Sequence, residues 1–303
     1  IWCSIMPSSY IIAEIGQAHE GSLGMAHSYI DALAETGVDA VKFQVHIAEA
    51  ESSPFEPFRV AFSYEDDSRF DYWKRMEFTK EQWSGLKDHC EEKGMDFITS
   101  TFSIAAVNLM DSIGVGHYKV GSGELGNHLM LERIAETGAR IILSSGMSSF
   151  DEIDDAVSLL KRYGSEPTLL QCTTAYPTEP EEWGLNVIAQ MKERYGVRVG
   201  FSDHSGEIFA CLAAAALGAE TFEFHVVFDK RMFGPDSPAS LDMKQVDEVV
   251  RGIRRIERSL QNPVNKEDSS SFDEMRAMFG KSLAVNRDVP EGHIITRDIL
   301  EMK

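Results

Sequence analysis

The sequence predicts an α/β protein whose main domain is a (β/α)8 barrel, the TIM-barrel architecture. Eight short runs rich in Val, Ile, Phe and Tyr recur along the chain, and a longer segment with helical spacing follows each run. This alternation is typical of a parallel sheet with crossover helices. Eight such units in about 250 residues match the size of a closed barrel. A doubly wound open sheet is the structural alternative.

Several of the expected strands are apolar on both faces, as a sheet requires when helices cover its outside and packed side chains fill its inside. In chain order the expected strands are Tyr10–Gly16, Val38–Val45, Met95–Thr101, Gly116–Ser122, Arg140–Gly146, Thr168–Thr174, Arg198–His204 and Thr221–Val227.

Capping-box spacing marks the start of two expected helices. Thr79 precedes Gln82 by three residues, and Ser149 precedes Glu152 in the same way. In this pattern each side chain of the pair bonds the other's backbone N–H, which satisfies two free donors of the first turn. A final helix is expected after the eighth strand, because one face of it collects the apolar residues Val246, Val249, Val250, Ile253, Ile256 and Leu260.

Two segments depart from the repeating pattern. Residues 49–78 are too long for a simple loop and carry prolines, aromatics and clustered acids, so they form either an ordered lid or a mobile insertion over one barrel end. A polar stretch from Asn262 to Ser271 resembles a linker. We therefore divide the chain into a catalytic barrel at 1–261, a linker at 262–278 and the incomplete beginning of a second domain at 279–303.

The charge balance excludes several classes of partner. Lys and Arg total 29 against 49 Asp and Glu, a formal charge of -20, so a broad electrostatic grip on nucleic acid or on an anionic membrane is not expected. No apolar run approaches the roughly 20 residues that span a bilayer, and no basic region followed by an apolar stretch opens the chain. The four cysteines lack CxxC spacing and are expected to be reduced packing residues. These features predict a soluble cytoplasmic protein.

Polar side chains gather at the carboxyl end of every expected strand. In a (β/α)8 barrel these ends converge around one mouth, where chemistry takes place. A polar group on an apolar strand costs a few kcal/mol if it is buried without a partner, so eight such placements indicate one site. The candidates are Glu14, Lys42, Gln44, Ser100, Lys119, Ser122, Glu124, Ser144, Thr174, Tyr176, Ser202, His204, Glu223 and His225.

Lys42 and Lys119 are the most informative of these residues. Buried lysine is rare and usually faces an anion, so the pair predicts a phosphate or carboxylate site. The alternative is a structural salt bridge to Glu14 or Glu124.

His204 and His225 end adjacent expected strands, a geometry in which two imidazoles could share one divalent metal. No HExxH or CxxC motif supports this interpretation, so spacing alone leaves it open. Asp203 and Glu223 are candidates to orient the two imidazoles.

An ordered set of motifs spanning about residues 10–303 resembles the sialic acid (nonulosonic acid) synthase family. The set comprises Ile11-Ile-Ala-Glu-Ile-Gly16, His19-Glu-Gly21, Val41-Lys-Phe-Gln44, Tyr118-Lys-Val-Gly-Ser-Gly-Glu124, Leu143-Ser-Ser-Gly-Met147, Gln171-Cys-Thr-Thr-Ala-Tyr-Pro177, Gly200-Phe-Ser-Asp-His204 and Gly234-Pro-Asp236. The resemblance implies a barrel enzyme that condenses phosphoenolpyruvate with an N-acetylated aminosugar aldehyde, such as N-acetylmannosamine. It also implies a divalent metal, Mn2+ with Mg2+ or Co2+ as alternatives.

The resemblance also assigns roles to individual residues. It implies that Lys42, Lys119, Ser122, Ser144 and Ser202 bind phosphoenolpyruvate, that Gln44, Glu124, Tyr176 and Asp236 contact the sugar, and that Ser100 and Thr174 belong to the substrate-binding set. His204 and His225 would hold the metal. Glu14 would be the acid/base carboxylate, with a pKa raised by neighbouring carboxylates, and Lys119, His204 and His225 would join it in catalysis.

The carboxyl-terminal residues 279–303 resemble the start of the antifreeze-like (SAF) domain of this family, and the resemblance implies a homodimer. Phe224 stands where the family usually has a basic residue. Two other functions stay open: a different phosphoenolpyruvate-dependent 3-deoxy sugar acid synthase, and a catalytically silent sugar-binding barrel.

Overall fold

The computed structural model describes residues 9–60 and 62–303. Contacts within the chain divide it into two units, one that ends at Gln261 and one that begins at Asn262. No helix in these described ranges is both long enough and apolar enough to cross a membrane.

The first unit is a closed parallel barrel, as predicted. Neighbouring strands pair in sequence order, and β1 also pairs with β8, which closes the sheet and rules out the open-sheet alternative. The strands are β1 (Tyr10–Gly16), β2 (Ala40–Val45), β3 (Asp96–Thr101), β4 (His117–Val120), β5 (Arg140–Ser144), β6 (Thr168–Cys172), β7 (Val199–Asp203) and β8 (Thr221–Val227), with the short β9 (Leu241–Asp242) beside β8.

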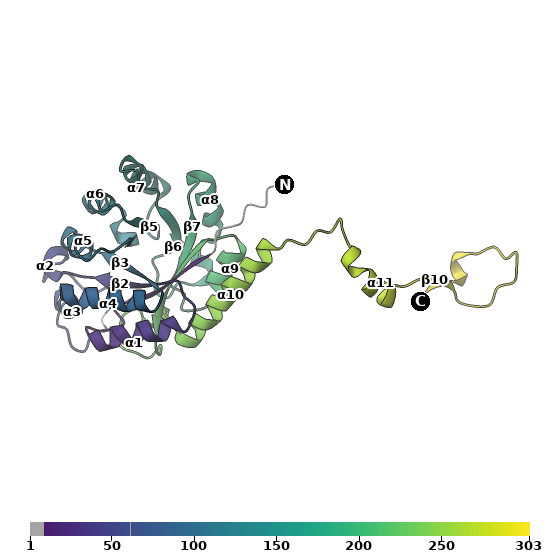
Figure 1. Ribbon diagram of the computed structural model, residues 1–303, viewed down its shortest axis with the longest axis horizontal. Helices are drawn as coiled ribbons and strands as arrows, with labels where there is room; N and C mark the ends of the chain where they lie inside the picture. Colours follow the sequence, from purple (N-terminus) through teal and green to yellow (C-terminus); the bar gives the residue numbers. More distant parts are fainter. Residues whose placement is uncertain (1–8, 61) are drawn as a thin grey trace. The chain divides into compact units, whose positions relative to one another are not determined.

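Helices surround the strands in Figure 1. Both predicted capping boxes form, at Thr79 with Gln82 and at Ser149 with Glu152. The helices of this unit are α1 (Leu23–Ala34), α2 (Ala48–Glu51), α3 (Arg69–Met76), α4 (Lys80–Glu92), α5 (Ile104–Asp111), α6 (His128–Glu136), α7 (Phe150–Arg162), α8 (Asn186–Tyr195), α9 (Phe209–Ala216) and α10 (Met243–Gln261).

Some expected strands are longer than the observed ones. Residues 116–122 were expected to be one strand, but β4 ends at Val120 and Ser122–Glu124 form a 3-10 turn. The backbone therefore leaves the ladder at Gly121, and Ser122 reaches the barrel mouth from a turn.

Side chains alternate between the two faces of each strand and so build two separate cores. A large core lies between the sheet and the helices, and it includes Phe224. A small core inside the barrel consists of Ile12, Ala40, Ile98, Ile142 and Leu170. Two residues further along these strands, the next inward layer is polar, because a strand repeats its face every second residue. The apolar layer thus forms the floor of a polar site.

The described residues of the insertion, 49–60 and 62–78, have a defined conformation in this structure. It contains α2 and α3, and its aromatics pack on each other and on the loop after β8. The Phe62 ring lies 4.9 Å from the Tyr72 ring and 5.4 Å from the Phe233 ring. Of the two alternatives left open by the sequence, the structure favours the ordered cover of the barrel mouth.

The second unit comprises residues 262–303. It contains α11 (Asp273–Phe279) and an antiparallel pair of β10 (Leu283–Val285) with β11 (Leu300–Met302). Residues 262–278, which we expected to be a linker, therefore include most of a helix. Cys90, Cys172 and Cys211 are free and buried, whereas Cys3 lies outside the described residues.

Candidate active site

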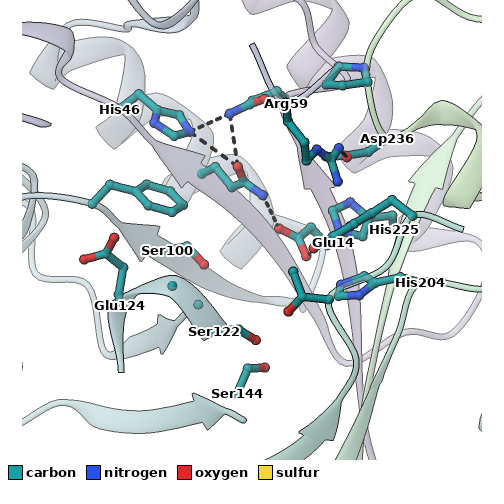
Figure 2. A pocket seen from close by; sticks show the side chains of 18 of the residues that line it. Glu14, His46, Arg59, Ser100, Ser122, Glu124, Ser144, His204, His225 and Asp236 are labelled. Atoms are coloured by element: carbon teal, nitrogen blue, oxygen red, sulfur yellow. Dashed lines mark hydrogen bonds and ion pairs between the residues drawn. The ribbon is translucent and has the colours of Figure 1, made fainter. Parts of the chain in front are cut away.

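A cavity of about 600 Å³ opens at the carboxyl ends of the barrel strands. Each of the eight strands, or the loop that follows it, contributes side chains to its wall. All the residues predicted to act in catalysis, substrate binding or metal binding line it: Glu14, Lys42, Gln44, Ser100, Lys119, Ser122, Glu124, Ser144, Thr174, Tyr176, Ser202, His204, His225 and Asp236. The further candidate Glu223 is not part of the wall. In Figure 2, Ser122 and Ser144 lie on one side of this space, and His204, His225 and Asp236 lie on the other.

Four buried charges cluster at the inner end of the cavity, and three of them, Glu14, Lys42 and Lys119, line its wall. Lys42 Nζ lies 3.0 Å from Glu14 Oε1 and 3.3 Å from Glu223 Oε2, and Lys119 Nζ lies 2.6 Å from Glu223 Oε1. All four side chains are 5% exposed or less. Burial of a charge costs several kcal/mol unless an opposite charge and hydrogen bonds compensate it. This lysine–glutamate cluster supplies both.

The cluster corrects three expectations. Glu124 is not a partner of the lysines, since it accepts a hydrogen bond from Asn127 instead. Glu223 does not orient a histidine but bridges the two lysines, and Ser202 Oγ donates to it at 2.9 Å. Asp203 does not orient one either, because it points away from the barrel interior and accepts from Ser205.

The electrostatic surroundings of Glu14 also differ from expectation. Burial by itself would raise the pKa of this carboxyl group, but His225, Lys42 and Lys119 outweigh burial and lower the pKa below its ordinary value. We expected the opposite direction because the chain is rich in acids. In the folded barrel the nearest charges to Glu14 are cationic, so Glu14 is ionised at neutral pH.

Ser144 carries an unused hydroxyl at the cavity wall. Among the described residues, its Oγ has no hydrogen-bond partner although it is buried. A buried polar atom without a partner costs about 1–3 kcal/mol, which a bound ligand could recover. Close to it, Ser122 Oγ accepts from the Gly146 N–H at 3.0 Å.

The two histidines of the site lie side by side, with ring centroids 5.3 Å apart. His204 Nδ1 lies 2.9 Å from the Thr173 carbonyl oxygen, a bond that requires a proton on Nδ1 and, in the neutral ring, leaves the lone pair on Nε2. His225 Nε2 lies 3.3 Å from Glu14 Oε2. Within the described part of the chain, no set of three or more His, Cys, Asp or Glu residues forms a metal-binding group.

The outer part of the cavity is aromatic and charged. The Arg59 guanidinium lies 4.1 Å above the Tyr176 ring and is paired with Asp236, and the Tyr176 ring stacks on His204 at 4.2 Å. Arg69, from α3, is paired with Glu56 at 3.4 Å. The arginines that the insertion brings to the cavity thus already have carboxylate partners.

Sequence reasoning missed several residues of the wall, among them Gln17, His46, Glu51, Arg59 and Trp73. A signal existed for His46, because it follows Lys42 and Gln44 at the same two-residue interval. Gln17 was harder to foresee. A bulge between Glu14 and Gly16 shifts the register by one residue, and the strand period then no longer applies. For Arg59 and Trp73 the sequence offers no signal.

Comparison with known proteins identifies similar chains. The sequence model of the NeuB family matches residues 29–265. The chain is 34% identical to N-acetylneuraminate-9-phosphate synthase of Homo sapiens, over 100% of this chain and 85% of that protein. It is 32% identical to N,N'-diacetyllegionaminic acid synthase of Campylobacter jejuni, over 98% and 91% respectively. The crystal structure of N-acetylneuraminic acid synthetase from Leptospira borgpetersenii superposes with a TM-score of 0.78, at 31% identity over 89% of this chain and 91% of that one.

Proposed function

The chain belongs to the NeuB family of sialic (nonulosonic) acid synthases, and from this premise we propose that it condenses phosphoenolpyruvate with an N-acetylated aminosugar aldehyde. The products would be a nonulosonic acid and inorganic phosphate. The observation that carries the proposal is the pair of buried lysines, Lys42 and Lys119, on the wall of one cavity that also holds two neighbouring imidazoles. As a member of this family of synthases, the protein is an enzyme that forms carbon–carbon bonds.

The lysine–glutamate cluster and the serines around it suit the anionic substrate. Phosphoenolpyruvate carries a phosphate and a carboxylate, and ammonium groups bind both as point charges. Ser144 supplies a hydroxyl that lacks a partner among the described residues, and Ser122 lies beside it. In a protein with a net charge of -20, Lys42 and Lys119 place ammonium groups on the cavity wall, where each is paired with a buried glutamate.

Other side chains of the cavity suit an aminosugar. Gln44 and Glu124 offer an amide and a carboxylate to sugar hydroxyls, and Tyr176 offers an aromatic face. Arg59 pairs with Asp236 and also lies over the Tyr176 ring, so it holds these two side chains near each other. We propose N-acetylmannosamine or a related 2-acetamido sugar as the acceptor.

His204 and His225 fit a divalent cation, because two adjacent imidazoles can bind one ion while water and substrate fill its other positions. The Thr173 carbonyl fixes the tautomer of His204 that leaves Nε2 free to bind the ion. When bound, such an ion supplies Lewis acidity toward the aldehyde oxygen. Mn2+, a homodimer, a cytoplasmic location and an antifreeze-like domain at 279–303 remain predictions.

The remaining steps use the side chains of the cavity. C3 of phosphoenolpyruvate attacks the aldehyde carbon, forming the new bond and leaving positive charge at C2. Water then adds to C2, and ionised Glu14 accepts its proton. The C2 hydroxyl then loses its remaining proton and becomes the ketone as phosphate departs with cleavage of its bond to C2. Of the two protons that water brought, one converts the alkoxide left by the aldehyde into a hydroxyl, and the other ends on the departing phosphate. Lys42 and Lys119 hold the phosphate and carboxylate throughout.

The test is phosphate release from phosphoenolpyruvate in the presence of Mn2+ and a panel of acceptors. The panel holds N-acetylmannosamine, its 6-phosphate, 6-deoxy diamino relatives and the aldose phosphates used by other 3-deoxy sugar acid synthases. We expect release with an N-acetylated acceptor. Release with the aldose phosphates alone would assign the chain to the other synthases, and no release with any acceptor would identify a silent barrel.

A further inference from the structure

His46 occupies an unusually constrained place at the cavity wall. Its ring is stacked between the Trp73 ring at 4.0 Å and the Phe102 ring at 4.4 Å, with interplanar angles of 3° and 8°. The residue is buried, and it directly follows β2, four residues after Lys42. The two aromatic neighbours hold the plane of the imidazole, so its two nitrogens can point in only two directions.

The hydrogen bonds at these two nitrogens define the tautomer. His46 Nδ1 lies 2.5 Å from Glu51 Oε1, and a carboxylate can only accept, so Nδ1 carries the proton. His46 Nε2 lies 2.5 Å from the Gln17 amide nitrogen and 3.3 Å from Gln44 Oε1, and the unprotonated Nε2 accepts from the nearer group, the Gln17 amide. A proton on Nε2 would instead oppose that amide donor.

A chain of hydrogen bonds continues from Gln17 through Gln44 to Glu14, the proposed catalytic carboxylate. Gln17 Nε2 also donates to Gln44 Oε1 at 3.0 Å, while the Tyr72 hydroxyl donates to Gln17 Oε1 at 3.1 Å. With its oxygen occupied in this way, Gln44 turns its amide nitrogen to Glu14 Oε1 at 2.7 Å. Figure 2 shows the connection from His46 to Glu14 as dashed lines through two side-chain amides.

We propose that His46, held by Glu51, is a positioning residue that fixes the amide orientation of Gln44 and, through it, the rotation of Glu14. This inference rests on the proposed function, in which Glu14 accepts a proton from water. A flipped Gln44 would place its oxygen against a carboxylate oxygen, losing one hydrogen bond and adding repulsion.

The fixed orientation has a direct chemical consequence. Glu14 Oε1 is occupied by Gln44 and by Lys42. The other oxygen, Oε2, faces His225 at 3.3 Å and is the one available to water. We call the chain of hydrogen bonds from His46 through Gln17 and Gln44 the relay. Its loss would let the Glu14 carboxylate rotate. The step in which Glu14 accepts a proton would then slow, while phosphoenolpyruvate binding would be retained.

The experiment compares the wild type with two substitutions in the full chain. His46→Phe keeps the stacked ring but removes both nitrogens. His46→Gln restores the polarity, because its amide nitrogen can donate to Glu51 and its oxygen can accept from Gln17. His27→Phe, on α1 and outside the cavity wall, is the matched control.

We expect His46→Phe to lower kcat about 10- to 100-fold, as misplacement of a reacting group does, with the KM for phosphoenolpyruvate within about twofold of wild type. His46→Gln should regain most of the lost kcat. A kcat for His46→Phe within about twofold of wild type would overturn the inference, as would a His46→Gln enzyme no faster than His46→Phe. If His46→Phe does not fold, Gln17→Met interrupts the same relay and should show the same loss of kcat.

A second measurement does not depend on turnover. In the 15N spectrum of histidine-labelled protein at pH 7.5, with the His46 signals assigned by their absence in His46→Gln, we expect the neutral tautomer protonated on Nδ1. A proton on Nε2 would overturn the inference. A wild type inactive with every acceptor would refute the proposed function, and the tautomer would then decide the positioning inference alone.

Discussion

Glu223→Gln is the sharpest test of the lysine–glutamate cluster. The substitution keeps the shape of the side chain and removes one of the two negative charges that face Lys42 and Lys119. Burial alone would raise the pKa of Glu223, but Lys119 and Lys42 outweigh it and lower the pKa, so the carboxylate is charged at neutral pH. After substitution, two buried ammonium groups would have Glu14 as their single buried counter-charge.

The expected magnitude follows from the burial of this side chain, which is 1% exposed. Removal of one partner from a buried ion pair costs about 3–5 kcal/mol, because the remaining charge stays buried without compensation. We expect the free energy of unfolding to fall by about 3 kcal/mol, the lower end of this range, because Gln can still accept a hydrogen bond from Lys119. Inorganic phosphate should then stabilise the variant more than the wild type, by up to about 2.7 kcal/mol at a hundred times its Kd.

The assay is urea unfolding followed by tryptophan fluorescence, at pH 7.5 with and without phosphate. Glu248→Gln, on the exposed face of α10 with its partner Lys244 at 3.9 Å, is the matched control and should change stability by less than about 0.5 kcal/mol. A Glu223→Gln protein as stable as wild type would refute the reasoning, and so would a phosphate effect no larger in the variant.

Three further predictions concern other parts of the barrel. Burial lowers the pKa of His19 to about 3, so the folded state binds a proton less readily than the unfolded chain. The contribution of neutral His19 to the free energy of unfolding is complete above about pH 6.5. It is lost as the pH falls toward 3, at about 1.4 kcal/mol per pH unit. In urea unfolding, the free energy of unfolding should therefore fall less between pH 7.5 and pH 5.5 in His19→Gln than in the wild type. An equal fall in both proteins would contradict this account. His225→Ala should weaken Mn2+ binding at least about tenfold in calorimetric titration, whereas unchanged binding would remove the ion from this site. A Cβ at Gly146 would lie 2.5 Å from Thr174 Oγ1 and 2.6 Å from Ser122 Oγ, so Gly146→Ala should raise the KM for phosphoenolpyruvate by displacing Ser122, and an unchanged KM would argue against a role for that serine.

Much of the fold and of the cavity wall can be predicted from local sequence patterns. The two-residue period of β2 places Ala40 in the apolar floor and Lys42 and Gln44 in the polar layer above it. The same period predicts that Phe224 faces the helices while Glu223 and His225 face the barrel interior, so the family's basic residue is replaced at an outward position. The period also places His46 in the wall, although His46 was not among the predicted site residues.

Other features could not be read from any local pattern. The insertion at 49–78 has no strand or helix period over most of its length, and its conformation depends on contacts such as Arg59 with Asp236, 177 residues apart. The bulge near Gly16 shifts the register of β1 and brings Gln17 to the wall. Neither the conformation of the insertion nor the bulge in β1 can be predicted from the composition of the neighbouring residues.

By itself, the sequence determined the order of strands and helices, the face that each strand side chain takes and the end of the barrel where polar groups collect, because these depend on periods of two and 3.6 residues within short segments. Only the tertiary structure decided which of the inward charges became partners. Closure of β1 on β8 and the stagger between strands set the depth of every layer, and Lys119 therefore meets Glu223 across 104 residues of chain. Such pairings arise from the geometry of the closed sheet, which no single segment contains.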